Sequence, residues 1–106
     1  MRTHLSGTTG RVADHVVDSI RLRVTTYGGP GDGLDHAPAV LLLHGFPTSS
    51  QLWRAVAPEM CASTEDALQI LAPDLAQLGG SERTGRRIDL ATQAKLMLGL
   101  LDTLDI

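Results

Sequence analysis

Residues 40–47, V-L-L-L-H-G-F-P, decide the fold of this chain. The four apolar residues that open this stretch are typical of a strand buried on both faces, and the His-Gly pair after them indicates a sharp turn. Residues 48–50, T-S-S, are good N-cap residues, and residues 51–60 carry apolar side chains at a helical spacing. The sequence therefore predicts a strand, a turn and a helix, and in open α/β sheets ligands bind where such strands end.

An antiparallel hairpin is predicted before this unit, and a second buried strand after it. β-branched residues alternate with polar ones over residues 11–17 and 20–27, with D-S between them as a tight turn. Residues 67–72, A-L-Q-I-L-A, have the composition of a buried strand, which Pro73 is expected to end. The order strand, helix, strand implies a right-handed crossover and therefore two parallel strands.

The last predicted helix spans residues 90–104, with Asp89 as its N-cap. Its apolar stripe, which is expected to face the sheet, consists of Leu90, Ala94, Met97, Leu98, Leu101 and Leu104. Residues 1–10 are polar and are expected to be disordered. Residues 28–35, G-G-P-G-D-G-L-D, are expected to form a flexible connector.

Length and composition limit the chain to one domain or part of one. Its 106 residues are 42% apolar and 20% charged, as in globular proteins. The net charge of −3 disfavours nucleic acids and anionic membrane surfaces as partners. Cys61 is the single cysteine, which excludes an internal disulfide, and we see no apolar leader or membrane-spanning run, so we expect a cytoplasmic protein.

Two segments carry a resemblance to a known family. Residues 40–54, V-L-L-L-H-G-F-P-T-S-S-Q-L-W-R, resemble the strand, oxyanion turn and first helix of the α/β-hydrolases, in the H-G-x-P branch of epoxide hydrolases, haloalkane or haloacetate dehalogenases and esterases. Residues 72–81, A-P-D-L-A-Q-L-G-G-S, are similar to the family string A-P-D-L-x-G-x-G-x-S. Gln77 replaces the first glycine of that string, so a positive φ there would be strained.

The resemblance implies a partial, N-terminal α/β-hydrolase domain over residues 1–106. The expected architecture is an α/β fold in which an antiparallel hairpin is followed by parallel strand-helix-strand-helix, with sheet order 1-2-4-3. It also implies that the backbone N–H of Phe46 is an oxyanion-hole donor, which stabilises developing negative charge but cannot start a reaction. The supporting residues that it implies are His44, Gly45 and Pro47 in the turn, and Asp74, Gly79 and Ser81 in the loop after the second parallel strand.

Some of these residues allow other interpretations. His44 could be a general base, although we expect it to brace the turn, and Asp74 could be a catalytic acid, although we expect it to organise its loop. Ser81 lies in G-G-S-E-R, which begins like a nucleophile elbow but lacks its last glycine and a strand directly before it. The side chain of Phe46 could line a substrate pocket or pack in the core, and Trp53 is expected to pack its helix onto the sheet.

The resemblance implies hydrolysis of an ester, epoxide or carbon–halogen bond in a small molecule, without a cofactor. No histidine follows His44, and the nucleophile and acid of the family are missing as well. We therefore expect the 106 residues to be inactive alone, as a gene fragment or one piece of a split protein. No set of His, Cys, Asp and Glu shows the spacing of a metal site.

Two other functions remain open from the sequence. The predicted order leaves the strand over residues 40–43 at the sheet edge, where it could pair with a C-terminal partner segment or a second copy. The chain could then be a non-catalytic interaction module. A small nucleotide-binding domain would need a Gly-rich turn directly after a strand, whereas H-G-F-P supplies one glycine.

Overall fold

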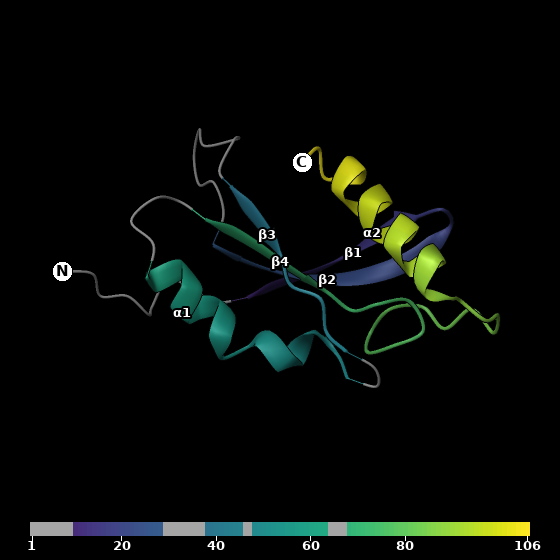
Figure 1. Cartoon of the computed structure of the whole chain (residues 1–106), viewed down its shortest axis with the longest axis horizontal. Helices are drawn as coiled ribbons and strands as arrows, with labels where there is room; N and C mark the ends of the chain where they lie inside the picture. The colour runs from purple at the N-terminus through teal and green to yellow at the C-terminus, as the bar shows by residue number, and fades with distance from the viewer. Residues whose placement is uncertain (1–9, 29–37, 46–47, 64–67) are drawn as a thin grey trace.

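The computed structural model describes residues 10–28, 38–45, 48–63 and 68–106 (Figure 1). The elements in chain order are β1 (Arg11–Val17), β2 (Ile20–Gly28), β3 (Ala39–Leu41), the 3-10 helix η2 (Ser50–Trp53), α1 (Val56–Ala62), β4 (Gln69–Pro73) and α2 (Leu90–Thr103). The strands form one sheet in the order β1-β2-β4-β3. β1 and β4 each pair antiparallel with β2, and β3 pairs parallel with β4. The predicted fold class and sheet order are confirmed.

A two-residue turn closes the hairpin of β1 and β2. Val17 pairs with Ile20, which leaves Asp18 and Ser19 as the turn, and their φ angles are 50° and 67°. Positive φ at both central positions is the geometry that matches the right-handed twist of the flanking strands. The hairpin predicted from the alternating pattern is therefore confirmed.

The two helices lie on opposite faces of the sheet (Figure 1). Alternate residues of β2 point to opposite faces. Ile20, Leu22 and Val24 enter the larger core, where α2 contributes Leu96, Met97 and Leu100. Tyr27, on the other face, joins Ala57, Ile70 and Ala72 in a smaller core beneath α1, against which Trp53 packs as expected.

The helix predicted after the H-G-F-P stretch is interrupted. Ser49 caps η2 by accepting a hydrogen bond from the N–H of Gln51, and α1 begins only at Val56. Pro58 explains the break, because in one continuous helix it could not donate to the carbonyl four residues earlier. In the first turn of α1, a backbone N–H has no partner within the helix, so proline loses no hydrogen bond there.

β3 is shorter and less buried than predicted. Its ladder covers Ala39–Leu41, its residues are exposed or half-buried, and Leu43 keeps 46% of its surface exposed. The prediction of a strand buried on both faces is therefore wrong. The physical reason is its position at the sheet edge, where no strand in the described part of the chain pairs with its outer side.

The apolar stripe predicted for the last helix is partly wrong. Asp89 is the N-cap, accepting from the N–H of Thr92 at 2.8 Å, and Met97 is buried as expected. Leu90 and Leu98, however, are 84% and 65% exposed. Ala94 is also exposed, whereas Leu96 and Leu100 are buried in the core in their place.

Gln93 explains why α2 is turned in this way. Its side-chain amide donates to the carbonyl of Ala76 at 2.9 Å and accepts from the N–H of Ala76 at 3.2 Å. This pair of hydrogen bonds holds a polar residue against the loop and fixes which side of the helix meets the sheet. On another side, Gly99 lies so close to Val17 that an added Cβ would meet its Cγ1 at 2.6 Å.

The predictions for residues 1–10 and 28–35 fall almost wholly outside the described residues. Gly10 and Gly28 are the described members of those ranges, and Gly28 ends β2 with a φ of 64°. Among the helices that the structure describes, none is long and apolar enough to cross a membrane.

Candidate functional site

The turn that follows β3 contains the predicted oxyanion-hole donor. Phe46 and Pro47 lie outside the described residues, while His44, Gly45 and Thr48 on either side of them are described. The N–H of Thr48 donates to the carbonyl of Gly45 at 2.9 Å, and the Thr48 hydroxyl donates to the same oxygen at 2.6 Å. The described ends of the turn are thus held together by two hydrogen bonds.

His44 links this turn to the residue after the end of β4. The side chain is buried, and its Nε2 lies 2.9 Å from the backbone nitrogen of Leu75. Because that backbone N–H must donate, Nε2 accepts and carries no proton. The proton then resides on Nδ1, which donates to the carbonyl of Gly45 at 2.8 Å. With both ring nitrogens engaged in this way, the imidazole has no free nitrogen with which to act as a general base.

Asp74 makes a second link from the same place. Its buried carboxylate accepts from the N–H of Ser50 at 2.6 Å through Oδ1 and from the N–H of Gly80 at 2.9 Å through Oδ2. Hydrogen bonds to an ionised carboxylate are roughly twice as strong as neutral ones. The Asp74 side chain therefore joins the start of η2 to the loop after β4.

The two links hold both ends of the turn. His44 lies before it and Ser50 lies after it, and their partners Leu75 and Asp74 are consecutive residues. The backbone between them is therefore attached at each end to one rigid segment, the exit of β4. The described residues at the two ends of the turn are therefore fixed relative to each other and to β4.

Gly79 is needed because of the Asp74 carboxylate. Its φ is 55°, and an added Cβ would lie 2.5 Å from Cγ of Asp74 and 2.6 Å from Oδ2. A residue with a side chain would be strained and would also push the carboxylate away from the N–H of Ser50. The glycine thus permits the close approach on which the link between the loop and η2 depends.

Ser81 ties the same loop to β2. Its hydroxyl donates to the carbonyl of Asp74 at 2.6 Å and accepts from the N–H of Arg23 at 2.8 Å. The residue is buried. Next to it, Glu82 accepts from the N–H of Arg21 through Oε1 and donates to the carbonyl of Arg21 from its backbone. The Ser81 hydroxyl therefore holds the loop to β2, whereas a nucleophilic serine needs an exposed hydroxyl beside a general base.

Gln77 occupies the position in which glycine was expected, and it takes a positive φ of 77°. Its backbone N–H donates to the carbonyl of Glu82, and its side chain accepts from the N–H of Thr84 and donates to the carbonyl of Arg86. A left-handed conformation costs a non-glycine residue about 1 to 2 kcal/mol. The side-chain hydrogen bonds offset that cost.

Substitution of Gln77 tests this balance. Gln77→Ala should lower the free energy of unfolding by about 1 to 3 kcal/mol, because the hydrogen bonds are lost while the strain remains. Gln77→Gly should be closer to the original chain, because it relieves the strain. Urea denaturation of the three proteins measures the difference, and equal stability of the Ala and Gly variants would contradict this explanation.

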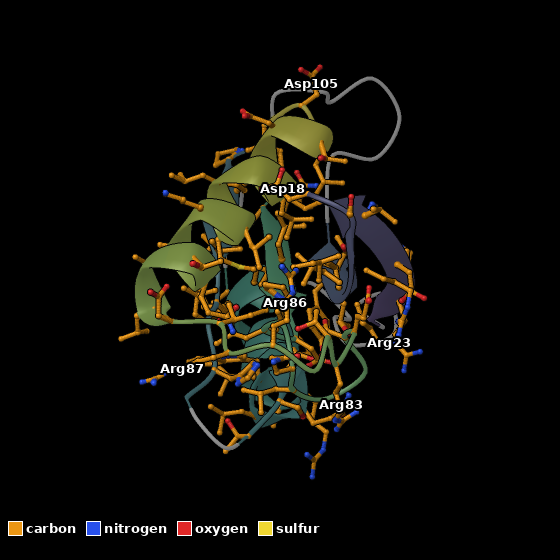
Figure 2. All side chains as sticks on the ribbon, turned by 90° about the vertical axis from the view of Figure 1, so that its right-hand side faces the viewer. Asp18, Arg23, Arg83, Arg86, Arg87 and Asp105 are labelled. Atoms are coloured by element: carbon orange, nitrogen blue, oxygen red, sulfur yellow. The ribbon has the colours of Figure 1, made fainter. Side chains whose placement is uncertain are left out.

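Charge is unevenly distributed around this region. Figure 2 shows Arg23, Arg83, Arg86 and Arg87 away from the end of the molecule that carries Asp105. Arg23 pairs with Asp14 at 3.5 Å, whereas the other three are exposed and have no ion pair within the described residues. The loop between β4 and α2 therefore carries three exposed arginines, although the chain as a whole is negative.

Outside this region, the Cys61 thiol and the Asp89 carboxyl have shifted pKa values. Burial raises the pKa of the Cys61 thiol, with Arg11 acting weakly in the opposite direction, so the reactive thiolate is disfavoured. Hydrogen bonds from Thr92 lower the pKa of the Asp89 carboxyl, as expected for an N-cap. No group of three or more potential metal ligands occurs among the residues that the structure describes.

Sequence reasoning named His44, Asp74, Gly79 and Ser81, and the structure brings their segments together. The sequence did not indicate the hydrogen-bond partners of these side chains, which are the backbone N–H groups of Leu75, Ser50, Gly80 and Arg23. Backbone groups leave no residue-type signal, so no pattern in the sequence could have identified them.

Comparison with known proteins agrees with this geometry. No protein-family model matches the chain. Epoxide hydrolase A of Mycobacterium tuberculosis is 36% identical over 97 residues, which cover 88% of this chain. The crystal structure of epoxide hydrolase A from Mycobacterium thermoresistibile matches 92% of the chain with a TM-score of 0.76 and 28% identity. The chain carries the N-terminal part of an α/β-hydrolase.

This hydrolase portion resembles more than one kind of enzyme. A haloalkane dehalogenase of Psychrobacter cryohalolentis is 36% identical over 80 residues, which cover 74% of this chain and 24% of that protein. The chain spans 28% of the length of each epoxide hydrolase A named above. The similarity therefore covers the part of the hydrolase fold that holds the turn after β3 and the loop after β4.

Proposed function

We propose that this chain supplies the oxyanion side of the active site in a cofactor-free hydrolase that cleaves an ester, epoxide or carbon–halogen bond of a small molecule. The backbone N–H of Phe46 is the proposed donor. The observation that supports this role is the attachment of both ends of the turn, through His44 and Ser50, to Leu75 and Asp74. The names of the relatives, epoxide hydrolase and haloalkane dehalogenase, support the class of reaction.

The proposed donor acts on charge that another group creates. When a nucleophile attacks, negative charge develops on an oxygen of the substrate or intermediate, and a fixed N–H lowers the energy of that state. One such donor contributes about 3 to 4 kcal/mol in the best cases. His44, Asp74 and Ser81 are committed to backbone partners, so none of them is proposed as nucleophile, base or acid.

The isolated 106-residue chain is therefore expected to show no turnover. Purified chain should hydrolyse a p-nitrophenyl ester, styrene oxide and 1-bromobutane no faster than buffer, as measured by absorbance, diol formation and bromide release. The chain with Phe46→Pro, which lacks the backbone N–H, serves as the matched control for contaminating activity. Hydrolysis that depends on Phe46 in the chain alone would contradict the assignment of a supporting role.

A second candidate is a non-catalytic interaction module that binds through β3. The observation that favours it is the unpaired outer side of β3 among the described residues. The two functions differ in one measurement. The hydrolase proposal requires activity when the missing part of the fold is supplied, whereas the interaction module would form a complex that hydrolyses none of the three substrates.

A further inference from the structure

α2 carries a ridge of side chains that faces directly away from the core. Three of its residues are buried in the core beneath the helix, and they define its inner side. Because successive residues of an α-helix are 100° apart, the opposite side carries Ala91, Lys95, Leu98 and Asp102. All four are exposed, and Leu98 keeps 65% of its surface exposed. We call these four residues the outer ridge.

Charge along the outer ridge changes sign at Leu98. Lys95 lies three residues before Leu98, and Asp102 lies four residues after it. The same order continues beyond the helix ends, with Arg87 before α2 and Asp105 after it. Figure 2 shows Arg87 and Asp105 at opposite ends of α2. This side of the molecule is thus positive toward the N-terminal end of α2 and negative toward its C-terminal end.

The negative charges at the end of α2 do not stabilise the helix itself. Negative charge is unfavourable near a helix C-terminus, yet Asp102 lies in the last turn of α2, which holds no basic residue. Asp105 follows with a φ of 60°, a conformation that strains a residue with a side chain. Asp102 and Asp105 therefore gain nothing from their own helix.

The charged groups of this side also lack an ion pair within the described part of the chain. None of the ion pairs among the described residues includes Arg87, Lys95, Asp102 or Asp105. The pKa of the Asp89 carboxyl is lowered mainly by its hydrogen bonds as N-cap, and Lys95 adds a smaller effect from a distance. All four charges are therefore available to a partner molecule.

A second copy of the chain supplies the complementary order of charge. If two outer ridges lie antiparallel, with a two-fold axis between Leu98 and Gly99, Lys95 of each copy faces Asp102 of the other. At 1.5 Å per residue, Lys95 and Asp102 each lie about 5 Å from that axis along the helix, on opposite sides of it. The same register brings the two Leu98 side chains together at the centre.

We propose that two copies of this chain associate through their outer ridges in this antiparallel, two-fold arrangement. Leu98 packs against Leu98 of the other copy, and a Lys95–Asp102 pair lies on either side. At each end Arg87 attracts Asp105 of the other copy, since charges interact over about 10 Å at moderate salt. A second copy fits better than an unrelated protein, because one surface carries both signs in the order that its two-fold copy needs. The inference is independent of the proposed reaction.

Sedimentation equilibrium of the full 106-residue chain measures the association. A single helix ridge is a small interface, so we expect an equilibrium of monomer and dimer at micromolar to millimolar concentrations. Raising NaCl from about 0.01 M to about 1 M should weaken it at least about tenfold, because the Debye length falls from about 30 Å to about 3 Å. A monomer at every concentration in low salt, or growth beyond a dimer, would overturn the proposal.

Reversal of one charge pair tests the register. Lys95→Glu and Asp102→Lys should each weaken the homodimer at least about tenfold, because each variant places like charges opposite one another at both ends of the contact. An equal mixture of the two variants should recover a dimer as the heterodimer, because both contacts then join opposite charges again. A mixture that stays monomeric would overturn the pairing of Lys95 with Asp102.

Two controls separate this effect from unfolding and from net charge. Asp102→Lys removes an unfavourable charge from the C-terminus of α2, so a weaker helix does not explain the loss of its dimer. Glu59→Lys makes the same change of charge on α1, on the other face of the sheet, and should leave the dimer intact. Equal effects of Glu59→Lys and Asp102→Lys would contradict the outer ridge as the contact.

A cysteine at the proposed axis gives a geometric test. In a Cys61→Ser background, Leu98→Cys should form an intermolecular disulfide on mild oxidation, because the two Cα atoms lie within the roughly 7 Å that a disulfide can span. Ala91→Cys should not, because its two copies would lie about 22 Å apart along the antiparallel helices. Non-reducing electrophoresis measures the cross-linked fraction, and equal cross-linking of the two variants would overturn the arrangement.

Discussion

Phe46→Pro is expected to lower kcat by about 100- to 1000-fold, with little change in KM, in a fusion of this chain to the C-terminal part of Mycobacterium tuberculosis epoxide hydrolase A. Proline has no backbone N–H, so the variant removes the proposed donor. The donor acts on charge that appears only in the transition state, and its loss should therefore affect kcat more than substrate binding. Steady-state hydrolysis of styrene oxide measures both constants.

The control for this experiment keeps the amide and removes the side chain. Phe46→Ala should retain most of kcat, and any increase in KM would report the contact of the aromatic ring with substrate. Circular dichroism and a urea melt of both fusions establish that each is folded. Equal kcat values for the Pro variant and the original fusion would rule out Phe46 as the donor, and an inactive original fusion would contradict the proposed function itself.

Local pattern was sufficient for much of the fold. The hairpin follows from alternation of β-branched and polar residues with an Asp-Ser turn, and the parallel pair follows from a strand-helix-strand order. Pro58 was a visible signal that one helix could not run through residues 51–61, and it would have predicted the break before α1. These features depend on a few neighbouring residues, so the sequence alone could indicate them.

The orientation of α2 depended on contacts that periodicity does not contain. The helix has apolar residues on two adjoining sides, so the hydrophobic pattern by itself fits more than one orientation. The Gln93 amide pairing with Ala76 and the close contact of Gly99 with Val17 select the side that carries Leu96 and Leu100. A polar residue turned inward by two backbone hydrogen bonds thus overrides the apolar stripe.

The same limit applies to the candidate site. Resemblance directed attention to His44, Asp74 and Ser81, while what each of them binds is a backbone group of a segment distant in sequence. Two of these contacts pass through the exit of β4, so their geometry follows from the parallel register of β3 and β4. The register is a tertiary property, and the links across it therefore became visible only in the structure.

Asp74→Ala is expected to be the most damaging substitution for stability in this region. It leaves the buried N–H of Ser50 and the half-buried N–H of Gly80 without their acceptor, and each such loss costs about 1 to 3 kcal/mol. The expected loss of about 3 to 5 kcal/mol is a large fraction of the stability of an ordinary domain. Asp74→Asn should be milder, because its single carbonyl oxygen can still accept from one of the two donors.

Asp14→Ala is the matched control for this substitution. Asp14 is a carboxylate as well, but its partners are arginines, at 3.4 Å for Arg21 and 3.5 Å for Arg23. Because the Asp14 side chain is 42% exposed, its loss should cost about 0 to 1 kcal/mol. Urea denaturation ranks the variants, and amide exchange at Ser50 and Gly80 should accelerate in Asp74→Ala alone. If Asp74→Ala and Asp14→Ala cost the same, the buried carboxylate does not hold the turn, and the basis for a preorganised Phe46 amide is lost.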